Sequence, residues 1–67
     1  MSESTYLSRM LDEQQEIKGR LKKLRRFMGS LAFKELKGPS KIALCRQKQI
    51  MQDYIDVLEH RLTLEAK

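Results

Sequence analysis

With 67 residues, 34% of them charged and 40% hydrophobic, the chain is long enough for one small domain and too short to bury a sizeable core by itself. The formal net charge is +5, and the longest apolar run, IALC at residues 42–45, is far shorter than the roughly 20 residues that cross a membrane. The single cysteine excludes an internal disulfide. The segment MSESTYLSRM lacks the apolar run of a secretory signal, so we expect a cytoplasmic protein.

The first predicted element is a helix over about residues 5–28. From Leu7, side chains suited to one packing seam recur at alternating intervals of three and four residues, with Gln14 as the single polar exception. An isolated polar residue in such a seam is typical of positions that fix helix register or oligomeric state. The seam positions of this helix are Leu7, Met10, Gln14, Ile17, Leu21, Leu24 and Met28.

A short helical connection is predicted next, over residues 30–37. Gly29 stands where a C-terminal glycine cap is expected, and the segment GSLAFKELKGPSK is bounded by Gly-Ser and by Gly-Pro-Ser. Phe27 and Phe33 flank this turn, so we expect their rings to close this end of the fold.

The second long helix is predicted over about residues 41–65, with Ser40 as its N-cap. Its apolar face is wider than one partner helix covers, because further apolar positions extend it on one side. The seam positions are Leu44, Met51, Tyr54, Ile55, Leu58 and Leu62, and the widening positions are Ala43, Ile50, Val57 and Leu64.

These elements predict an all-α fold, an antiparallel helical hairpin with a short helical turn between two long helices, as one domain over residues 1–67. Each long helix would measure about 36 Å, and folding back at the turn places Ile17 near Tyr54. It also places Tyr6 near Leu64. Because apolar surface is left over, we expect a homo-oligomer, either a four-helix bundle or a higher assembly.

Charge is distributed unevenly along the chain. Residues 18–48 carry a net charge of +10, whereas residues 1–17 sum to −3 and residues 49–67 to −2. On a hairpin the acidic ends coincide and the basic middle forms one pole, which could meet phosphate, an acidic protein surface or the acidic ends of a second hairpin. The candidate anion- or partner-binding residues are Lys18, Arg20, Lys22, Lys23, Arg25, Arg26, Ser40, Lys41, Arg46 and Lys48.

No group of residues indicates catalysis, and we expect neither enzyme activity nor a cofactor. Cys45 and His60 fall near opposite ends of the predicted hairpin, which excludes a nucleophile pair, and Cys45 is expected to be partly buried. The acidic residues of the first helix have no histidine at ligand spacing, so no metal site is predicted. Among them, Glu16 is expected to pair with Arg20 one turn later.

The segments YLSRMLDEQQEIKGRLKKLRRFM, FKEL and QKQIMQDYIDVLEHRL resemble a group of very small helical-hairpin proteins of tailed bacteriophages and prophages, over roughly residues 6–62. This resemblance implies an accessory protein that is expressed in the bacterial cytoplasm. It also implies that the protein works by binding and blocking a host component.

The leading hypothesis is therefore a non-enzymatic phage or prophage accessory protein that binds stoichiometrically to a host protein, such as a defence factor. The alternative is an oligomeric binder, or sponge, for a phosphate-rich ligand, either a nucleic acid or a signalling nucleotide, held by the basic pole. The affinity for nucleic acid would fall steeply with salt, by roughly 0.9 log units per tenfold increase in salt for each neutralised phosphate, whereas a nucleotide in a shaped pocket would be less salt-sensitive. A third reading is a purely structural coiled-coil adaptor, which predicts neither effect.

Overall fold

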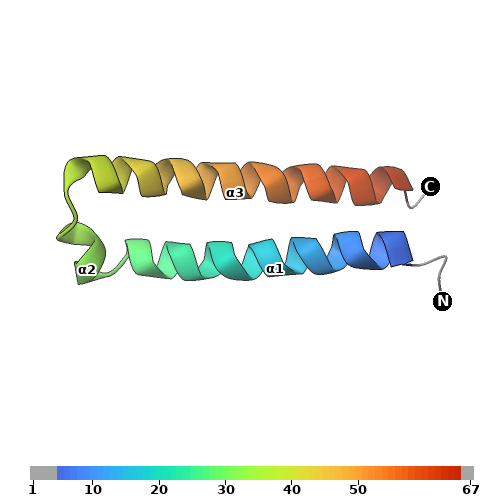
Figure 1. Cartoon of the computed structure of the whole chain (residues 1–67), viewed down its shortest axis with the longest axis horizontal. Helices are drawn as coiled ribbons and strands as arrows, with labels where there is room; N and C mark the ends of the chain where they lie inside the picture. The colour runs from blue at the N-terminus through green and yellow to red at the C-terminus, as the bar shows by residue number, and fades with distance from the viewer. Residues whose placement is uncertain (1–4, 66–67) are drawn as a thin grey trace.

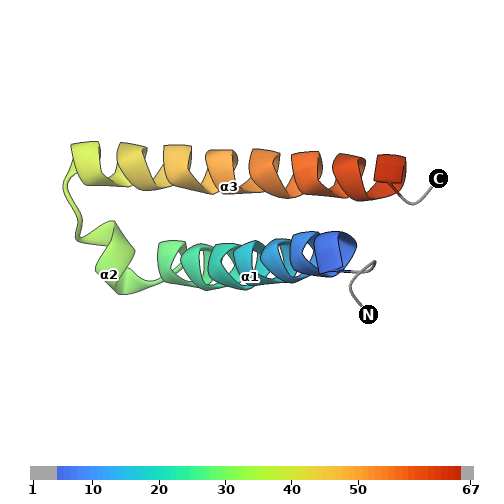
Figure 2. The same ribbon diagram turned by 45° about the vertical axis from the view of Figure 1, so that its right-hand side comes forward.

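The computed structural model describes residues 5–65, which form α1 (Thr5–Met28), α2 (Leu31–Lys34) and α3 (Gly38–Glu65). The two long helices lie side by side and antiparallel, and α2 joins them at one end, which we call the closed end (Figures 1 and 2). No strand occurs in this range. The all-α hairpin predicted from the sequence is confirmed.

α1 ends at Met28 without a left-handed glycine cap. Gly29 follows the helix as expected, but no glycine within residues 5–65 has a positive φ. The chain tightens instead, because the Gly29 amide donates to the Arg26 carbonyl at 3.2 Å and the Ser30 amide donates to the Phe27 carbonyl at 2.9 Å. Ser30 then caps α2, since its Oγ accepts from the Phe33 amide at 3.3 Å.

α3 begins at Gly38, earlier than the sequence indicates, and this corrects the role of Ser40. The Lys41 amide donates to the Lys37 carbonyl at 3.1 Å, so helical hydrogen bonding is already established there. Pro39 is compatible with this start, because the first turn of a helix needs no amide donor. Ser40 is thus an exposed residue within the first turn and is not the N-cap.

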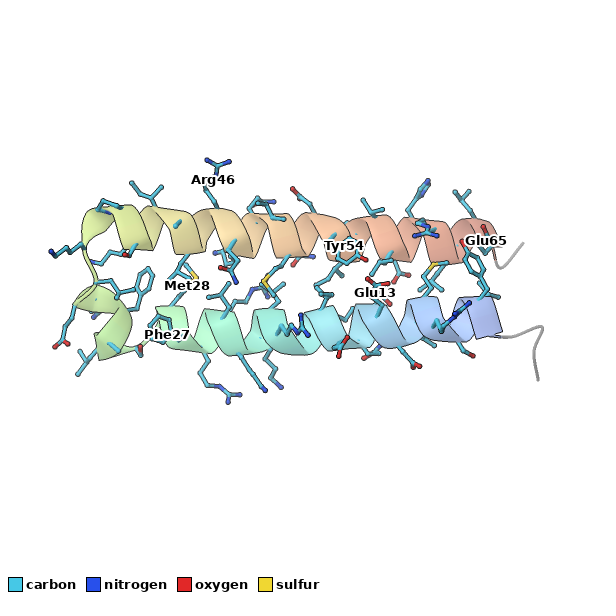
Figure 3. The ribbon with its side chains drawn as sticks, in the orientation of Figure 1. Glu13, Phe27, Met28, Arg46, Tyr54 and Glu65 are labelled. Atoms are coloured by element: carbon cyan, nitrogen blue, oxygen red, sulfur yellow. The ribbon has the colours of Figure 1, made fainter. Side chains whose placement is uncertain are left out.

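Phe27 and Phe33 contact one another at the closed end, where the sequence placed them. The centroids of Phe27 and Phe33 are 6.1 Å apart and their planes meet at 88°, an edge-to-face contact. The Lys41 ammonium lies 5.9 Å from the centroid of the Phe33 ring, within the range of a cation–π interaction. Figure 3 shows Phe27 at the end of α1, next to α2.

The core is a single seam between α1 and α3. Its most deeply buried apolar residues are Met10, Leu21, Ile55 and Leu58, and Leu58 has no exposed surface. The other predicted seam residues are half-buried, except Leu7 and Tyr54, which lie at the edge of the seam with 36% and 37% of their surface exposed. The core is therefore narrow.

Gln14 is the buried polar residue of the seam, with 2% of its surface exposed. Its Nε2 donates to Glu59 Oε1 at 2.8 Å and lies 3.5 Å from the Ile55 carbonyl oxygen. Every buried side-chain nitrogen or oxygen within residues 5–65 has a hydrogen-bond partner. The amide of Gln14 therefore joins α1 to α3 at a defined register.

Further hydrogen bonds join the two helices at the edge of the seam. Arg61 Nη2 donates to the Tyr6 hydroxyl at 2.7 Å, and the Tyr54 hydroxyl donates to the Glu13 carboxylate. Figure 3 shows Glu13 and Tyr54 pointing toward one another between α1 and α3. Arg61 lies one turn before Leu64, the predicted neighbour of Tyr6, and Leu64 is 57% exposed.

Cys45 is exposed, which contradicts the prediction that it is partly buried. It follows the half-buried seam residue Leu44, and one residue turns an α-helix by about 100°, so its side chain points away from the seam.

Tyr54 is expected to lose its proton only above the ordinary tyrosine pKa of 10.0, because its hydrogen bond to Glu13 favours the protonated phenol and raises the pKa. Since the pKa is raised in the folded state, the stabilisation is fully present below the unfolded pKa and is lost as the pH rises through the folded pKa. Phenolate absorbance in a Tyr6→Phe background measures this titration. Adding Glu13→Gln should lower the midpoint, and an unchanged midpoint would contradict the assignment.

Candidate anion-binding groove

A groove with a volume of about 330 Å³ lies between α1 and α3 along the basic half of α1. We call it the basic groove. The residues that line it are Lys18, Leu21, Lys22, Arg25, Gln52 and Ile55.

Helical spacing brings the three cations of the basic groove together. Lys18, Lys22 and Arg25 follow one another at intervals of four and three residues, so they share one side of α1. Leu21 and Ile55 are 4% and 6% exposed and form an apolar floor beneath the charges. The groove thus combines a positively charged wall with an apolar floor.

Arg25 is held in place by a hydrogen bond across the groove. Its Nη2 donates to Gln52 Oε1 at 3.0 Å, and Gln52 Nε2 donates to Asp56 Oδ1 at 3.1 Å. These contacts orient the guanidinium against α3 and leave several of its five N–H groups able to meet a ligand. No acidic side chain is among the residues that line the groove.

This arrangement suits an anion that also has a flat apolar part. A guanidinium can donate two parallel hydrogen bonds to a phosphate, and lysine ammonium groups add mobile positive charge. The apolar floor can contact a ring. Pockets for small molecules have volumes of about 300–1,000 Å³, so the basic groove suits a ligand of modest size.

Only three of the predicted anion- or partner-binding residues line the basic groove. Arg46 projects from the side of α3 that faces away from α1 (Figure 3). Arg20 lies 4.0 Å from the Glu16 carboxylate, which confirms the predicted pair. The predicted residues outside the groove are Arg20, Lys23, Arg26, Ser40, Lys41, Arg46 and Lys48.

Gln52 is the groove residue that the sequence did not indicate. A glutamine on a helix surface gives no signal of its own, and its contact with Arg25 depends on the register between α1 and α3. The spacing of Gln52 and Asp56, four residues apart, was a visible but non-specific sign of a local hydrogen bond.

A second cavity, of about 300 Å³, lies on the hairpin near its open end. It is lined by Tyr6, Arg9, Met10, Glu13 and Arg61. The negative charge of Glu13 offsets part of the positive charge of Arg9 and Arg61. Arg61 also donates a hydrogen bond to the Tyr6 hydroxyl. This mixed charge makes the second cavity less suited to an anion than the basic groove.

Within residues 5–65, no group of three or more His, Cys, Asp or Glu side chains is placed to hold a metal ion. No helix in the same range has an apolar stretch long enough to cross a lipid bilayer.

Comparison with curated proteins gives no match, and comparison with solved structures gives none. The model of the Sequestin family matches residues 4–64, which cover α1, α2 and all of α3 except its last residue, Glu65. Because the match spans nearly the whole chain, this protein belongs to the Sequestin family.

Proposed function

We propose that this protein is a non-enzymatic binder that sequesters a small phosphate-bearing molecule, such as a nucleotide, in the basic groove. The observation that carries the proposal is the convergence of Lys18, Lys22 and Arg25 above an apolar floor. The family name, Sequestin, supports a sequestering role. Binding without turnover also fits the lining residues, which include no carboxylate, histidine, cysteine or hydroxyl group.

In this proposal each part of the groove has a separate role. Arg25, oriented by Gln52, donates paired hydrogen bonds to a phosphate, and the two lysines neutralise its remaining charge. The ring of the ligand lies over Leu21 and Ile55. Because the ligand binds only the folded hairpin, it should stabilise the protein by about 2.7 kcal/mol at a hundredfold excess over Kd.

Reversing the charge of Lys22 is expected to weaken nucleotide binding roughly ten- to a hundredfold, the value of one charge-assisted hydrogen bond. The measurement is isothermal titration of ADP into the wild type and into Lys22→Glu. The matched control is Lys23→Glu, which changes the net charge equally at the neighbouring position but does not line the groove. Equal losses in the two variants would show that net charge, and not the groove, attracts the ligand.

A short DNA duplex distinguishes nucleotide binding from nucleic-acid binding. Affinity for DNA should fall by roughly 0.9 log units per tenfold increase in salt for each neutralised phosphate, whereas affinity for ADP should fall less. If the protein binds the duplex and does not bind ADP, the functional surface is the whole basic pole and not the groove.

A second candidate function is a phage or prophage accessory role in binding an acidic host protein. Exposed apolar side chains at the closed end support it, because Leu31 and Ile42 are 75% and 64% exposed in a region that also carries Lys34 and Lys37. This candidate requires an acidic host protein that binds the wild type in a fixed ratio and fails to bind Ile42→Ser. If such a complex survives that substitution, the closed end is not the binding surface.

A further inference from the structure

A second row of apolar side chains runs along α3, and all of its members are exposed. Its members recur every seven residues, and we call them the outer row: Ala43, Ile50, Val57 and Leu64. Three of these side chains, Ile50, Val57 and Leu64, are 60%, 52% and 57% exposed. A spacing of seven keeps residues on nearly one face of a helix, with a drift of about 20° per step, and this is the pattern of a helix that packs along another helix.

The outer row lies on the outer side of the hairpin. At about 100° per residue, Val57 is about 100° from the buried Leu58 and about 160° from Ile55 around α3. Arg46, one turn before Ile50, projects away from α1 (Figure 3). The outer row is therefore open to a partner that approaches α3 from the side opposite α1.

The basic groove is on a different face of α3. Gln52, its residue on this helix, is about 160° from Ile50 and about 140° from Val57. A partner seated on the outer row would leave the groove accessible, so the two surfaces can be tested separately.

The charges of α3 indicate the partner. Residues 38–48 contain three basic side chains and no acidic one, whereas residues 49–65 contain four acidic side chains and one arginine. The two parts of the helix therefore carry net charges of +3 and −3. An antiparallel copy of α3 places each basic part beside an acidic part, whereas a parallel copy places like charges together.

We infer that a second copy of this chain packs antiparallel on the outer row, so that the two α3 helices form the centre of a dimer. In this arrangement Ile50 faces Val57 of the second copy, and Ala43 faces Leu64. The dimer is more open than a square four-helix bundle, because the outer row lies well round α3 from the seam. It presents two separate basic grooves.

Sedimentation equilibrium over a range of protein concentrations tests the dimer. The wild type should dimerise, and Ile50→Ser should raise the dimer dissociation constant at least about tenfold, since it removes apolar surface from the centre of the row. Ile42→Ser is the matched control, the same change at an exposed position outside the row, and it should leave the constant unchanged. Circular dichroism verifies that both variants remain helical.

Orientation is tested by disulfide formation in a Cys45→Ser background, since the native thiol is exposed. An equal mixture of Ile50→Cys and Val57→Cys proteins should form mainly the mixed disulfide, because these positions face one another only in the antiparallel dimer. Disulfides mainly between identical chains would overturn the antiparallel arrangement. A wild type that is monomeric at all concentrations, yet binds ADP, would overturn the dimer and leave the proposed function intact.

Discussion

Leu58→Ala is expected to remove about 2–5 kcal/mol from the free energy of unfolding, the range observed when a buried leucine is truncated and its cavity stays partly open. Leu58 has no exposed surface and lies where α3 packs against α1. Only four other side chains within residues 5–65 are buried, so little neighbouring core can collapse into the gap. Because small domains are only marginally stable, we expect this single change to unfold a large part of the population.

Urea denaturation followed by circular dichroism, at one fixed protein concentration, measures this loss. The control is Leu31→Ala, the same truncation at a side chain that is 75% exposed, and its effect should stay within about 0.5 kcal/mol. Similar midpoints for the two variants would mean that the seam at Leu58 is not the core of the protein.

Gln14→Glu is expected to destabilise the hairpin by about 3–5 kcal/mol at neutral pH, as is typical when a buried polar pair is replaced by an uncompensated charge. The Gln14 amide now donates to Glu59 Oε1 at 2.8 Å. The substitution removes that donor and brings two carboxylates together at a position with 2% exposure. It also ends the weaker contact with the Ile55 carbonyl oxygen.

The loss in Gln14→Glu should shrink in acid. Burial and the neighbouring carboxylate both raise the pKa of the new carboxyl in the folded state, so the folded variant binds a proton more readily than the unfolded one. Its stability relative to the wild type therefore increases as the pH falls through that raised pKa. Urea midpoints measured across this range follow the effect.

Two further variants define the cause. Gln15→Glu makes the same chemical change at an exposed neighbour and should have little effect on stability. Adding Glu59→Gln to Gln14→Glu reverses donor and acceptor and should recover part of the loss. If Gln14→Glu and Gln15→Glu behave alike, the buried hydrogen bond to Glu59 does not contribute to stability.

The spacing of apolar residues along the chain was sufficient to predict the two long helices and the side on which they pack. The alternation of three and four residues from Leu7 to Met28 is a property of neighbours in sequence, and it predicts both a helix and the side that packs. The aromatic contact of Phe27 and Phe33 was also predictable, because these residues lie on either side of one short turn. The hairpin followed from two such helices and a connection too short for any other arrangement.

Short-range backbone detail was less predictable. Ser30 caps α2, and Ser40 does not cap α3, although each serine closely follows a glycine in the turn region. The choice depends on which amides remain without a helical partner, and that depends on where each helix begins. A sequence pattern locates a helix end only to within a few residues.

What only the tertiary structure decided is which of the basic side chains line a groove together with residues of α3. The sequence indicated one basic pole, but the register between α1 and α3 selects Lys18, Lys22 and Arg25 for the groove and turns Arg46 to the opposite side. That register rests on contacts between residues far apart in the chain, such as Gln14 with Glu59. Amino-acid sequence by itself determined the helical hairpin, because helices arise from local periodicity. The groove required the structure, because a side chain's neighbours across two helices are set by packing and not by spacing.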